Sequence, residues 1–121
     1  MDREGAESSF ERLAAVQSGY SGVGRRTMFG RDGLTVNGRF FAFRDKDRLL
    51  LKLPRVTRDA LLAEGHAISA RSVSPTMTTW VAVPYGSRAV DWSSLTDQAR
   101  EFVARASGEP PGSPEPPAPS V

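Results

Sequence analysis

The chain has 121 residues, 16 basic and 14 acidic side chains, one histidine and no cysteine. This length indicates a single domain, and the lack of cysteine excludes a disulfide framework, a thiolate zinc site and a cysteine nucleophile. The longest apolar run, Trp80 to Tyr85, has six residues and is too short to cross a membrane. The N-terminal residues are polar and carry no secretory signal. We therefore expect a cytoplasmic protein without a membrane segment.

The first half of the chain predicts one helix and three strands. A capping-box pattern at Ser8 and Glu11 precedes an apolar face that includes Phe10 and Leu13, which indicates a helix. The Asn37-Gly38 pair is typical of a type I′ hairpin turn, because both positions tolerate positive φ. The predicted helix spans 9–18, and the predicted strands span 25–36, with an interruption at 30–33, then 39–44 and 48–53.

Alternation along these strands predicts which side chains share a face of the sheet. In the third strand, three leucines at 49, 51 and 53 alternate with Arg48, Leu50 and Lys52. We expect the leucines to be buried and the other three to face solvent, as an antiparallel sheet allows. In the second strand, regular alternation places Arg39 with Phe41 and Phe43, and Arg44 with Phe40.

The second half of the chain predicts two more helices and two more strands. A helix begins near Pro54 and ends at about Glu64, and two strands follow near 67–73 and 78–84. The last helix, 93–106, carries an apolar stripe in which we expect Phe102 to be buried. The fold class is therefore α+β: two layers, with a mostly antiparallel five-stranded sheet, helices on one face, and the order α-β(3)-α-β(2)-α.

The C-terminal segment differs from the rest of the chain in composition. Residues 108–121 hold six of the nine prolines and no apolar period. We expect one domain over 1–107 and a disordered, solvated, proline-rich tail over 108–121.

Basic residues concentrate in the predicted meander and the start of the second helix. Between Arg25 and Arg58 there are ten basic and three acidic residues. A sheet face rich in arginine can follow a phosphate backbone, although the same residues can simply keep a sheet face soluble and unpaired at its edge. The candidate nucleic-acid-binding residues are Arg25, Arg26, Arg31, Arg39, Arg44, Arg48 and Lys52.

Other candidate sites favour structural roles. His66 follows the end of the second helix and has no neighbouring nucleophile–carboxylate pair in the sequence. The glycine-rich segments 19–24 and 30–33 fit neither phosphate-binding fingerprint, and Asp32, Asp45 and Asp47 lack the spacing of a calcium loop. Four aromatic residues could in principle form a stacking platform for bases, but a core role is favoured; they are Phe40, Phe41, Phe43 and Trp80. We expect no catalytic residue, no metal ligand and no cofactor.

Several short motifs together resemble a known family. Met28-Phe29-Gly30, the run Gly33 to Phe43 and Leu49 to Leu53 resemble the N-terminal domain of the bacterial TfoX/Sxy proteins. The segments Trp80 to Val83, Val90 to Trp92 and the final helix also resemble the related YjbR/MmcQ proteins. The resemblance covers about residues 10–106 and implies the same α-β(3)-α-β(2)-α fold. It implies a regulatory role linked to natural competence for the first family and a DNA-binding role for the second.

Two functional hypotheses follow from the sequence. The first is a small, non-enzymatic regulatory or protein-interaction domain that binds a protein partner. The alternative is a nucleic-acid-binding module that uses the basic meander. An enzyme or small-ligand domain is disfavoured by the single histidine, the absence of cysteine and the scattered carboxylates.

Overall fold

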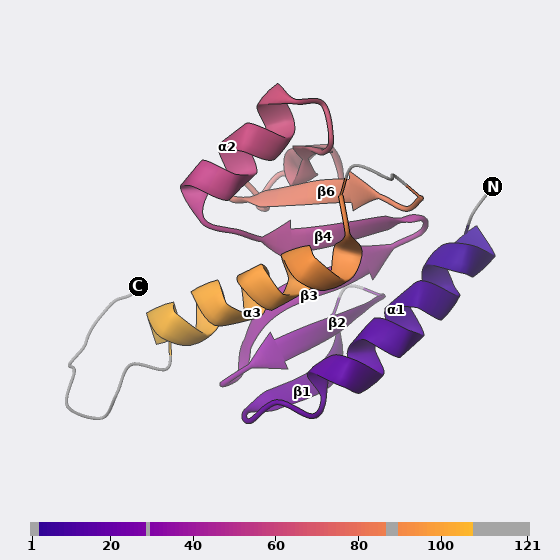
Figure 1. The fold of residues 1–121 in the computed structure, drawn as a ribbon, viewed down its shortest axis with the longest axis vertical. Helices are drawn as coiled ribbons and strands as arrows, with labels where there is room; N and C mark the ends of the chain where they lie inside the picture. Colours follow the sequence, from indigo (N-terminus) through magenta and orange to yellow (C-terminus); the bar gives the residue numbers. More distant parts are fainter. Residues whose placement is uncertain (1–2, 29, 87–89, 108–121) are drawn as a thin grey trace.

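A computed structural model describes residues 3–28, 30–86 and 90–107, and it shows an α+β fold with a helical layer against one face of a sheet (Figure 1). The predicted fold class is therefore confirmed. The prediction for residues 108–121 lies outside the described part of the chain. The elements are α1 (Arg3–Gln17), β1 (Val23–Met28), β2 (Arg31–Val36), β3 (Arg39–Asp45), β4 (Arg48–Lys52), α2 (Arg55–Ala63), β5 (Ile68–Ser69), the 3₁₀ turn η1 (Ala70–Ser72), β6 (Trp80–Pro84) and α3 (Trp92–Ser107).

The sheet has six strands in the order β1-β2-β3-β4-β6-β5, and every pair of neighbours is antiparallel. The expected five strands become six because the first predicted strand is in fact the hairpin β1–β2. Gly30, with φ of 75°, lies in the turn between them, a conformation that glycine adopts without strain. The chain order is therefore α-β(4)-α-β(2)-α. The strand expected at 67–73 is also wrong in extent, since only Ile68 and Ser69 pair before η1 begins.

The turn predicted at Asn37-Gly38 is confirmed. Both residues have positive φ, 54° and 83°, which is the backbone geometry of the type I′ turn that joins β2 to β3. The next turn, between β3 and β4, contains Lys46 with φ of 59°. These two tight turns keep β2, β3 and β4 in register as neighbours in the centre of the sheet.

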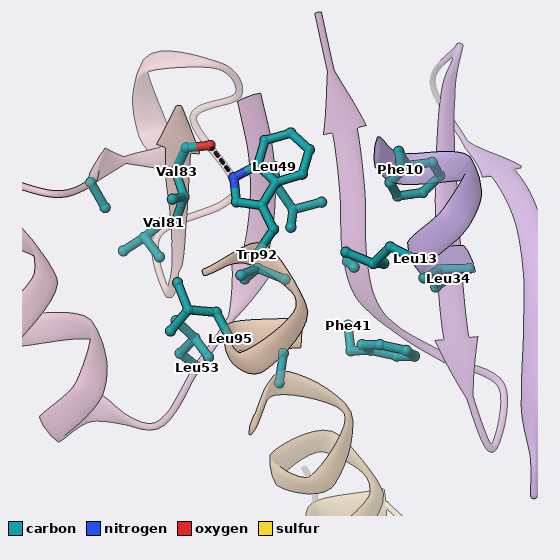
Figure 2. Packing of buried hydrophobic residues seen from close by; sticks show 14 of the residues in the cluster. Phe10, Leu13, Leu34, Phe41, Leu49, Leu53, Val81, Val83, Trp92 and Leu95 are labelled. Atoms are coloured by element: carbon teal, nitrogen blue, oxygen red, sulfur yellow. Dashed lines mark hydrogen bonds between the residues drawn. The ribbon is translucent and has the colours of Figure 1, made fainter. Parts of the chain in front are cut away.

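The main core lies between the sheet and the helices (Figure 2). The three leucines of the third predicted strand, Leu49, Leu51 and Leu53, are fully buried there, as expected. Trp92, at the start of α3, donates its indole N–H to the Val83 carbonyl at 3.2 Å. This bond gives a buried donor its partner and fixes α3 to β6.

Two features of the helices differ from the sequence prediction: the first residue of α1 and the buried side of α3. Helix α1 begins at Arg3 and not at Ser9, because Ala6 and Phe10 are one turn apart and both pack into the core. In α3 the buried stripe is Trp92, Leu95, Ala99 and Val103. Phe102, which the sequence predicted to be buried, lies beside that stripe and is only partly buried against the core.

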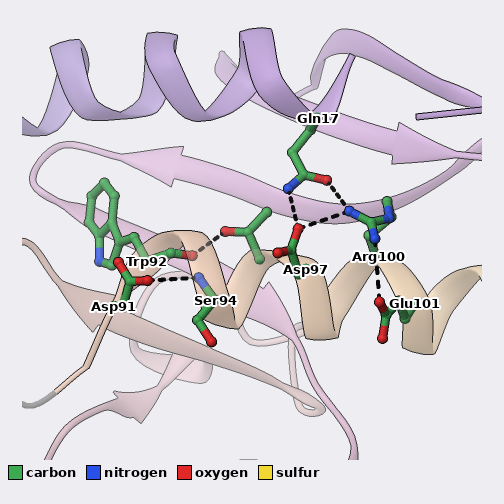
Figure 3. A network of polar contacts seen from close by, with 8 residues as sticks. Gln17, Asp91, Trp92, Ser94, Asp97, Arg100 and Glu101 are labelled. Atoms are coloured by element: carbon green, nitrogen blue, oxygen red, sulfur yellow. Dashed lines mark hydrogen bonds and ion pairs between the residues drawn. The ribbon is translucent and has the colours of Figure 1, made fainter. Parts of the chain in front are cut away.

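A polar network joins α1 to α3 near the edge of the core (Figure 3). The Gln17 side chain donates to Asp97 at 2.8 Å and accepts from Arg100 at 2.8 Å, while Arg100 also donates to Asp97 at 2.9 Å. The Arg100 guanidinium lies 3.6 Å from the centre of the Tyr20 ring. Gln17 and Arg100 are both buried. Their hydrogen bonds to each other and to Asp97 offset the free-energy cost of removing these polar groups from water.

Strand β3 contains an extra residue that interrupts its alternation. Leu34 pairs with Ala42 and Thr35 pairs with Phe40, which leaves Phe41 between them without a partner in β2. This β-bulge lets Phe41 point into the helical layer together with Ala42, while Phe40 and Phe43 both lie on the other face. The expected groupings of Phe41 with Phe43 and of Arg44 with Phe40 are therefore wrong, since Arg44 pairs with Leu49 and shares the face of the main core.

The face of the sheet away from the helices carries a second, smaller apolar cluster. Phe43, Leu50, Ala70 and Ala82 are buried in it, and Trp80 packs against them. Leu50 is fully buried because η1 and the segment that follows it cover this part of the face. The expectation that Leu50 faces solvent is wrong, whereas its neighbours Arg48 and Lys52 are partly exposed. No helix in the described residues is long and apolar enough to cross a membrane.

The bulge predicts unequal effects for two adjacent phenylalanines. Phe41→Ala removes a fully buried ring from the main core and should lower the free energy of unfolding by roughly 3–5 kcal/mol. Phe40→Ala removes a partly exposed ring from the other face and should cost about 1 kcal/mol. Urea unfolding followed by circular dichroism measures both. Equal losses, or a larger loss for Phe40→Ala, would show that β3 has no bulge at this position.

Candidate functional site

The seven basic residues predicted as a nucleic-acid surface do not form one surface. Four of them make ion pairs with carboxylates, and the pairs lie on both sides of the sheet. The pairs are Arg25–Glu11 at 2.6 Å, Arg25–Asp32 at 3.2 Å, Arg31–Asp45 at 2.9 Å, Arg44–Glu7 at 3.6 Å and Arg48–Asp45 at 3.0 Å. Much of the positive charge that the sequence concentrates in the meander is thus neutralised locally.

Two of these arginines face the helical layer. Arg25 makes a two-pronged contact with Glu11 of α1 and lies 5.5 Å from the centre of the Phe10 ring. The hydrogen bond from Arg25 lowers the pKa of Glu11, and the pKa of Arg25 is raised in turn. Arg44 reaches Glu7 of the same helix. Both arginines therefore tie α1 to the sheet.

Arg31 and Arg48 converge on Asp45. The Asp45 side chain is only 12% exposed and accepts hydrogen bonds from both guanidinium groups. Its burial would raise its pKa, but the hydrogen bond and the charge of Arg31, followed by those of Arg48, outweigh this and hold the pKa of Asp45 below its ordinary value. This three-residue cluster therefore links the start of β2, the end of β3 and the start of β4.

The remaining three candidates, Arg26, Arg39 and Lys52, have no carboxylate partner among the described residues. Arg39 and Lys52 are among the residues that line a groove on the face of the sheet away from the helices. Lys52 pairs with Trp80 and shares its face, whereas Arg39 pairs with Val36 of the main core and borders the groove from the end of the β2–β3 hairpin. Arg26 pairs across the β1–β2 hairpin with Gly33, so the two residues share a face. Arg39 and Lys52 therefore bring positive charge without a carboxylate partner to this groove, whereas Lys46, in the turn between β3 and β4, lines a different hollow beside Arg44 and Asp45.

The groove has a volume of about 430 Å³ and is lined by aromatic and methionine side chains together with polar and basic ones. Its apolar lining is Phe40, Phe43, Trp80, Met28 and Met77. Its polar lining includes Arg31, Arg39, Lys52, Ser74 and Thr76. We call this feature the aromatic groove.

The three aromatic rings form a continuous row. The ring centres of Phe40 and Phe43 are 4.5 Å apart with the planes inclined by 22°, and those of Phe43 and Trp80 are 5.4 Å apart. Phe43 is only 4% exposed and forms the floor, whereas Phe40 and Trp80 are partly exposed. Proline rings, aromatic side chains and nucleobases can all pack on such a row.

Two backbone features make room for the row. The bulge at Phe41 brings Phe40 and Phe43 to one face, where regular alternation would separate them. Gly33, on the neighbouring strand, leaves space beside both rings, because a Cβ there would lie 2.8 Å from each of them. A side chain at position 33 would therefore force the rings to move.

The other candidates from the sequence lie outside the groove. His66 lies just after α2, with its Nε2 3.5 Å from a carboxylate oxygen of Glu64. No group of three or more His, Asp or Glu side chains in the described residues could hold a metal ion. Of the four aromatic residues considered as a platform, Phe40, Phe43 and Trp80 come together, and Phe41 belongs to the core. Met28 and Met77 were missed because no sequence pattern marks them.

The Asp45 cluster predicts a pH-dependent contribution to stability. The folded-state pKa of Asp45 is lower than its unfolded value of about 3.9, so the stabilisation is present above that pH and is lost as pH falls through the folded pKa. Asp45→Asn should reduce the free energy of unfolding by roughly 1.5–3 kcal/mol at about pH 7, and the difference from the wild type should nearly vanish near pH 2. Urea unfolding at the two pH values measures it.

Asp47→Asn is the matched control, because Asp47 lies in the same turn region without an ion pair among the described residues. Asp47→Asn should change the free energy of unfolding only slightly from that of the wild type at both pH values. If Asp45→Asn costs the same near neutral and acidic pH, the pairing with Arg31 and Arg48 is not the source of the stability.

Comparison with protein families assigns the chain to one of them. The model of the TfoX N-terminal domain matches residues 15–108, which is most of the chain and includes every strand of the sheet. Comparisons with curated proteins and with solved structures found no significant match. The resemblance to the TfoX/Sxy proteins is thereby confirmed, while the relation to YjbR/MmcQ stays a prediction. The chain belongs to the TfoX N-terminal domain family.

Proposed function

We propose that the chain is a non-enzymatic, cytoplasmic protein-interaction domain with a regulatory role, and that the aromatic groove is its binding surface. The partner we infer is an acidic peptide segment that carries proline or aromatic side chains. The observation that supports this most directly is the row Phe40–Phe43–Trp80 beside Arg39 and Lys52, two cations without a carboxylate partner in the described residues.

The lining of the groove favours a peptide. Its floor, Phe43, is buried, and its walls hold Met28 and Met77, whose flexible side chains adapt to partners of varied shape. Two unpaired cations at the rim select for acidic residues and increase the association rate. An apolar groove with a few polar groups at its margin is the usual form of a site that binds one short segment.

The chemistry of the groove supports binding without catalysis. Its described lining residues include no carboxylate and no imidazole, the groups that most often transfer protons in enzymes. Asp45, a carboxylate that contacts the lining residue Arg31, is also paired with Arg48. We therefore propose no reaction at this site.

Single-stranded nucleic acid is a second candidate partner. The partly exposed rings of Phe40 and Trp80 next to Arg39 and Lys52 are the combination that binds bases by stacking and phosphates by charge. It ranks second because four of the seven predicted basic residues are already paired with carboxylates. A long phosphate backbone would find few free charges outside the groove.

Selection of peptides on the full-length protein tests the proposal. Peptides from a random displayed library should be enriched in acidic residues together with proline or aromatic residues. Trp80→Ala and the double variant Arg39→Glu/Lys52→Glu should weaken the binding of the selected peptides by roughly tenfold or more, the loss typical of a central contact residue. Isothermal titration calorimetry gives the affinities.

The double variant Arg12→Glu/Arg55→Glu is the matched control, since it makes the same change of charge on exposed helical positions. It should retain the affinity. Peptides that bind the groove variants and the wild type equally would contradict the proposal. Fluorescence anisotropy with a labelled oligothymidine tests the second candidate. If the library yields no binding peptide, and the groove variants lose oligothymidine binding while the control variant keeps it, the partner is nucleic acid and not a protein.

A further inference from the structure

The chain itself contains a segment with the chemistry that the aromatic groove selects. Residues 108–121 include Glu109, Glu115 and six prolines, and they include no basic residue. We propose that this segment docks in the aromatic groove of the same molecule and competes there with the partner. This inference rests on the proposed function, because it concerns the regulation of the same site.

Charge complementarity supports this occupant. The segment carries two negative side chains, while Arg39 and Lys52 line the groove and Arg26 lies on the same face of the sheet. None of these three cations has a carboxylate partner in the described part of the chain. Glu115, placed among prolines, brings a carboxylate to the rim when its neighbours lie in the groove.

The spacing of the prolines fits a row of rings. Polyproline II has three residues per turn, so Pro114 and Pro117 project from the same side of the segment. Grooves lined by aromatic residues bind such pairs because the conformation is already extended and loses little entropy on binding. Phe40 and Trp80, on either side of Phe43, offer two partly exposed rings to two prolines. The many prolines and the lack of an apolar period in the segment predict a solvated tail, whereas the groove offers it an apolar surface.

The segment begins close enough to reach the groove. Lys52 ends β4 and pairs with Trp80, which begins β6, so the part of the groove that these two residues line lies at this end of the two strands. In Figure 1 the C-terminal end of α3 lies toward the same end of the sheet as the arrowhead of β4. From Ser107 to Pro114, an extended chain spans roughly 20 Å, and packed layers are separated by about 10 Å. Residues 108–113 can therefore pass the ends of the strands.

Attachment to the domain makes weak binding sufficient. A short flexible connection gives an effective concentration in the millimolar range. A segment whose intrinsic dissociation constant is about 1 mM would then occupy the groove about half of the time. Such partial occupancy lowers the apparent affinity for a partner without preventing its binding.

Paramagnetic broadening in nuclear magnetic resonance spectra tests the docking directly. The chain has no cysteine, so Ser113→Cys gives a single attachment point for a nitroxide label on the full-length protein. The amide signals of Phe40, Lys52 and Trp80 should lose most of their intensity, and reduction of the label should restore them. Leu95, on the opposite side of the sheet, should keep its signal.

Changes within the tail separate docking from mere proximity. Pro114→Gly/Pro117→Gly should abolish most of the broadening at the groove, because it removes the two rings on one side. Pro110→Gly/Pro111→Gly is the matched control, with the same number of prolines removed from the connecting part, and it should keep the broadening. Broadening confined to the last turn of α3, at Arg105 and Ala106, would overturn the inference. The inference would also be overturned if the groove signals of unlabelled-tail, ¹⁵N-labelled protein were broadened by a second, spin-labelled copy to the same extent, because the contact would then lie between molecules.

The outcomes distinguish this inference from the proposed function. Selected peptides that bind the groove, with no broadening from position 113, would overturn the docking of the tail and leave the proposed function standing. If the groove signals are broadened and no selected peptide removes the broadening, the docking of the tail would stand and the proposed function would be overturned. The groove would then bind only the tail of its own chain.

Discussion

An extra residue in β3 decides which side chains each face of the sheet presents. Without it, Phe40 and Phe43 would lie on opposite faces, because side chains alternate along a strand. With Phe41 bulged into the helical layer, the core receives one ring and the other face receives two. The row of aromatic rings, the apolar cluster around Leu50 and the groove above them all depend on this shift.

The bulge in β3 depends on the small residue Gly33 in the neighbouring strand β2. Gly33 lies against both rings, and any larger residue would fill the space that they occupy. The hairpin at Asn37-Gly38 then fixes how β2 and β3 start to pair, so the bulge is held between two constraints on the same pair of strands. Glycine within a strand often accompanies a bulge, and a bulge re-aims the side chains beside it.

Ion pairs change the electrostatic character that the sequence suggests. The meander is rich in basic residues, but Glu7 and Glu11 of α1 reach across to Arg44 and Arg25, and Asp45 joins Arg31 to Arg48. These carboxylates come from positions that are distant in sequence or across a turn, so counting charge along the chain misses them. What remains without a carboxylate partner around the groove, among the described residues, is a small set of cations beside apolar rings. The proposal of a short acidic segment in preference to a long polyanion rests on this combination.

Local patterns in the sequence predict the fold class well, and they fail where tertiary contacts decide. The turn at Asn37-Gly38, the leucines of β4 and the final helix are predicted because each has a local signal. The separation of β1 from β2 was missed because a glycine within an apparent strand indicates a bulge as readily as a turn. The aromatic row is predicted only as a disfavoured platform that includes Phe41, because an irregular residue in β3 leaves no mark in the alternation of FFAF. Met28 and Met77 were missed because they come from segments that only the fold brings together.

Nuclear Overhauser contacts among the aromatic rings test the central claim most directly. In a spectrum of the full-length protein with labelled aromatic side chains, the ring protons of Phe40 should show contacts to Phe43, and those of Phe43 to Trp80, at ring separations of 4.5 Å and 5.4 Å. Phe41 should show contacts to side chains of the main core and none to the ring of Phe43. Contacts between Phe41 and Phe43, with Phe40 in contact with the main core, would mean that β3 alternates regularly and that the aromatic groove does not form.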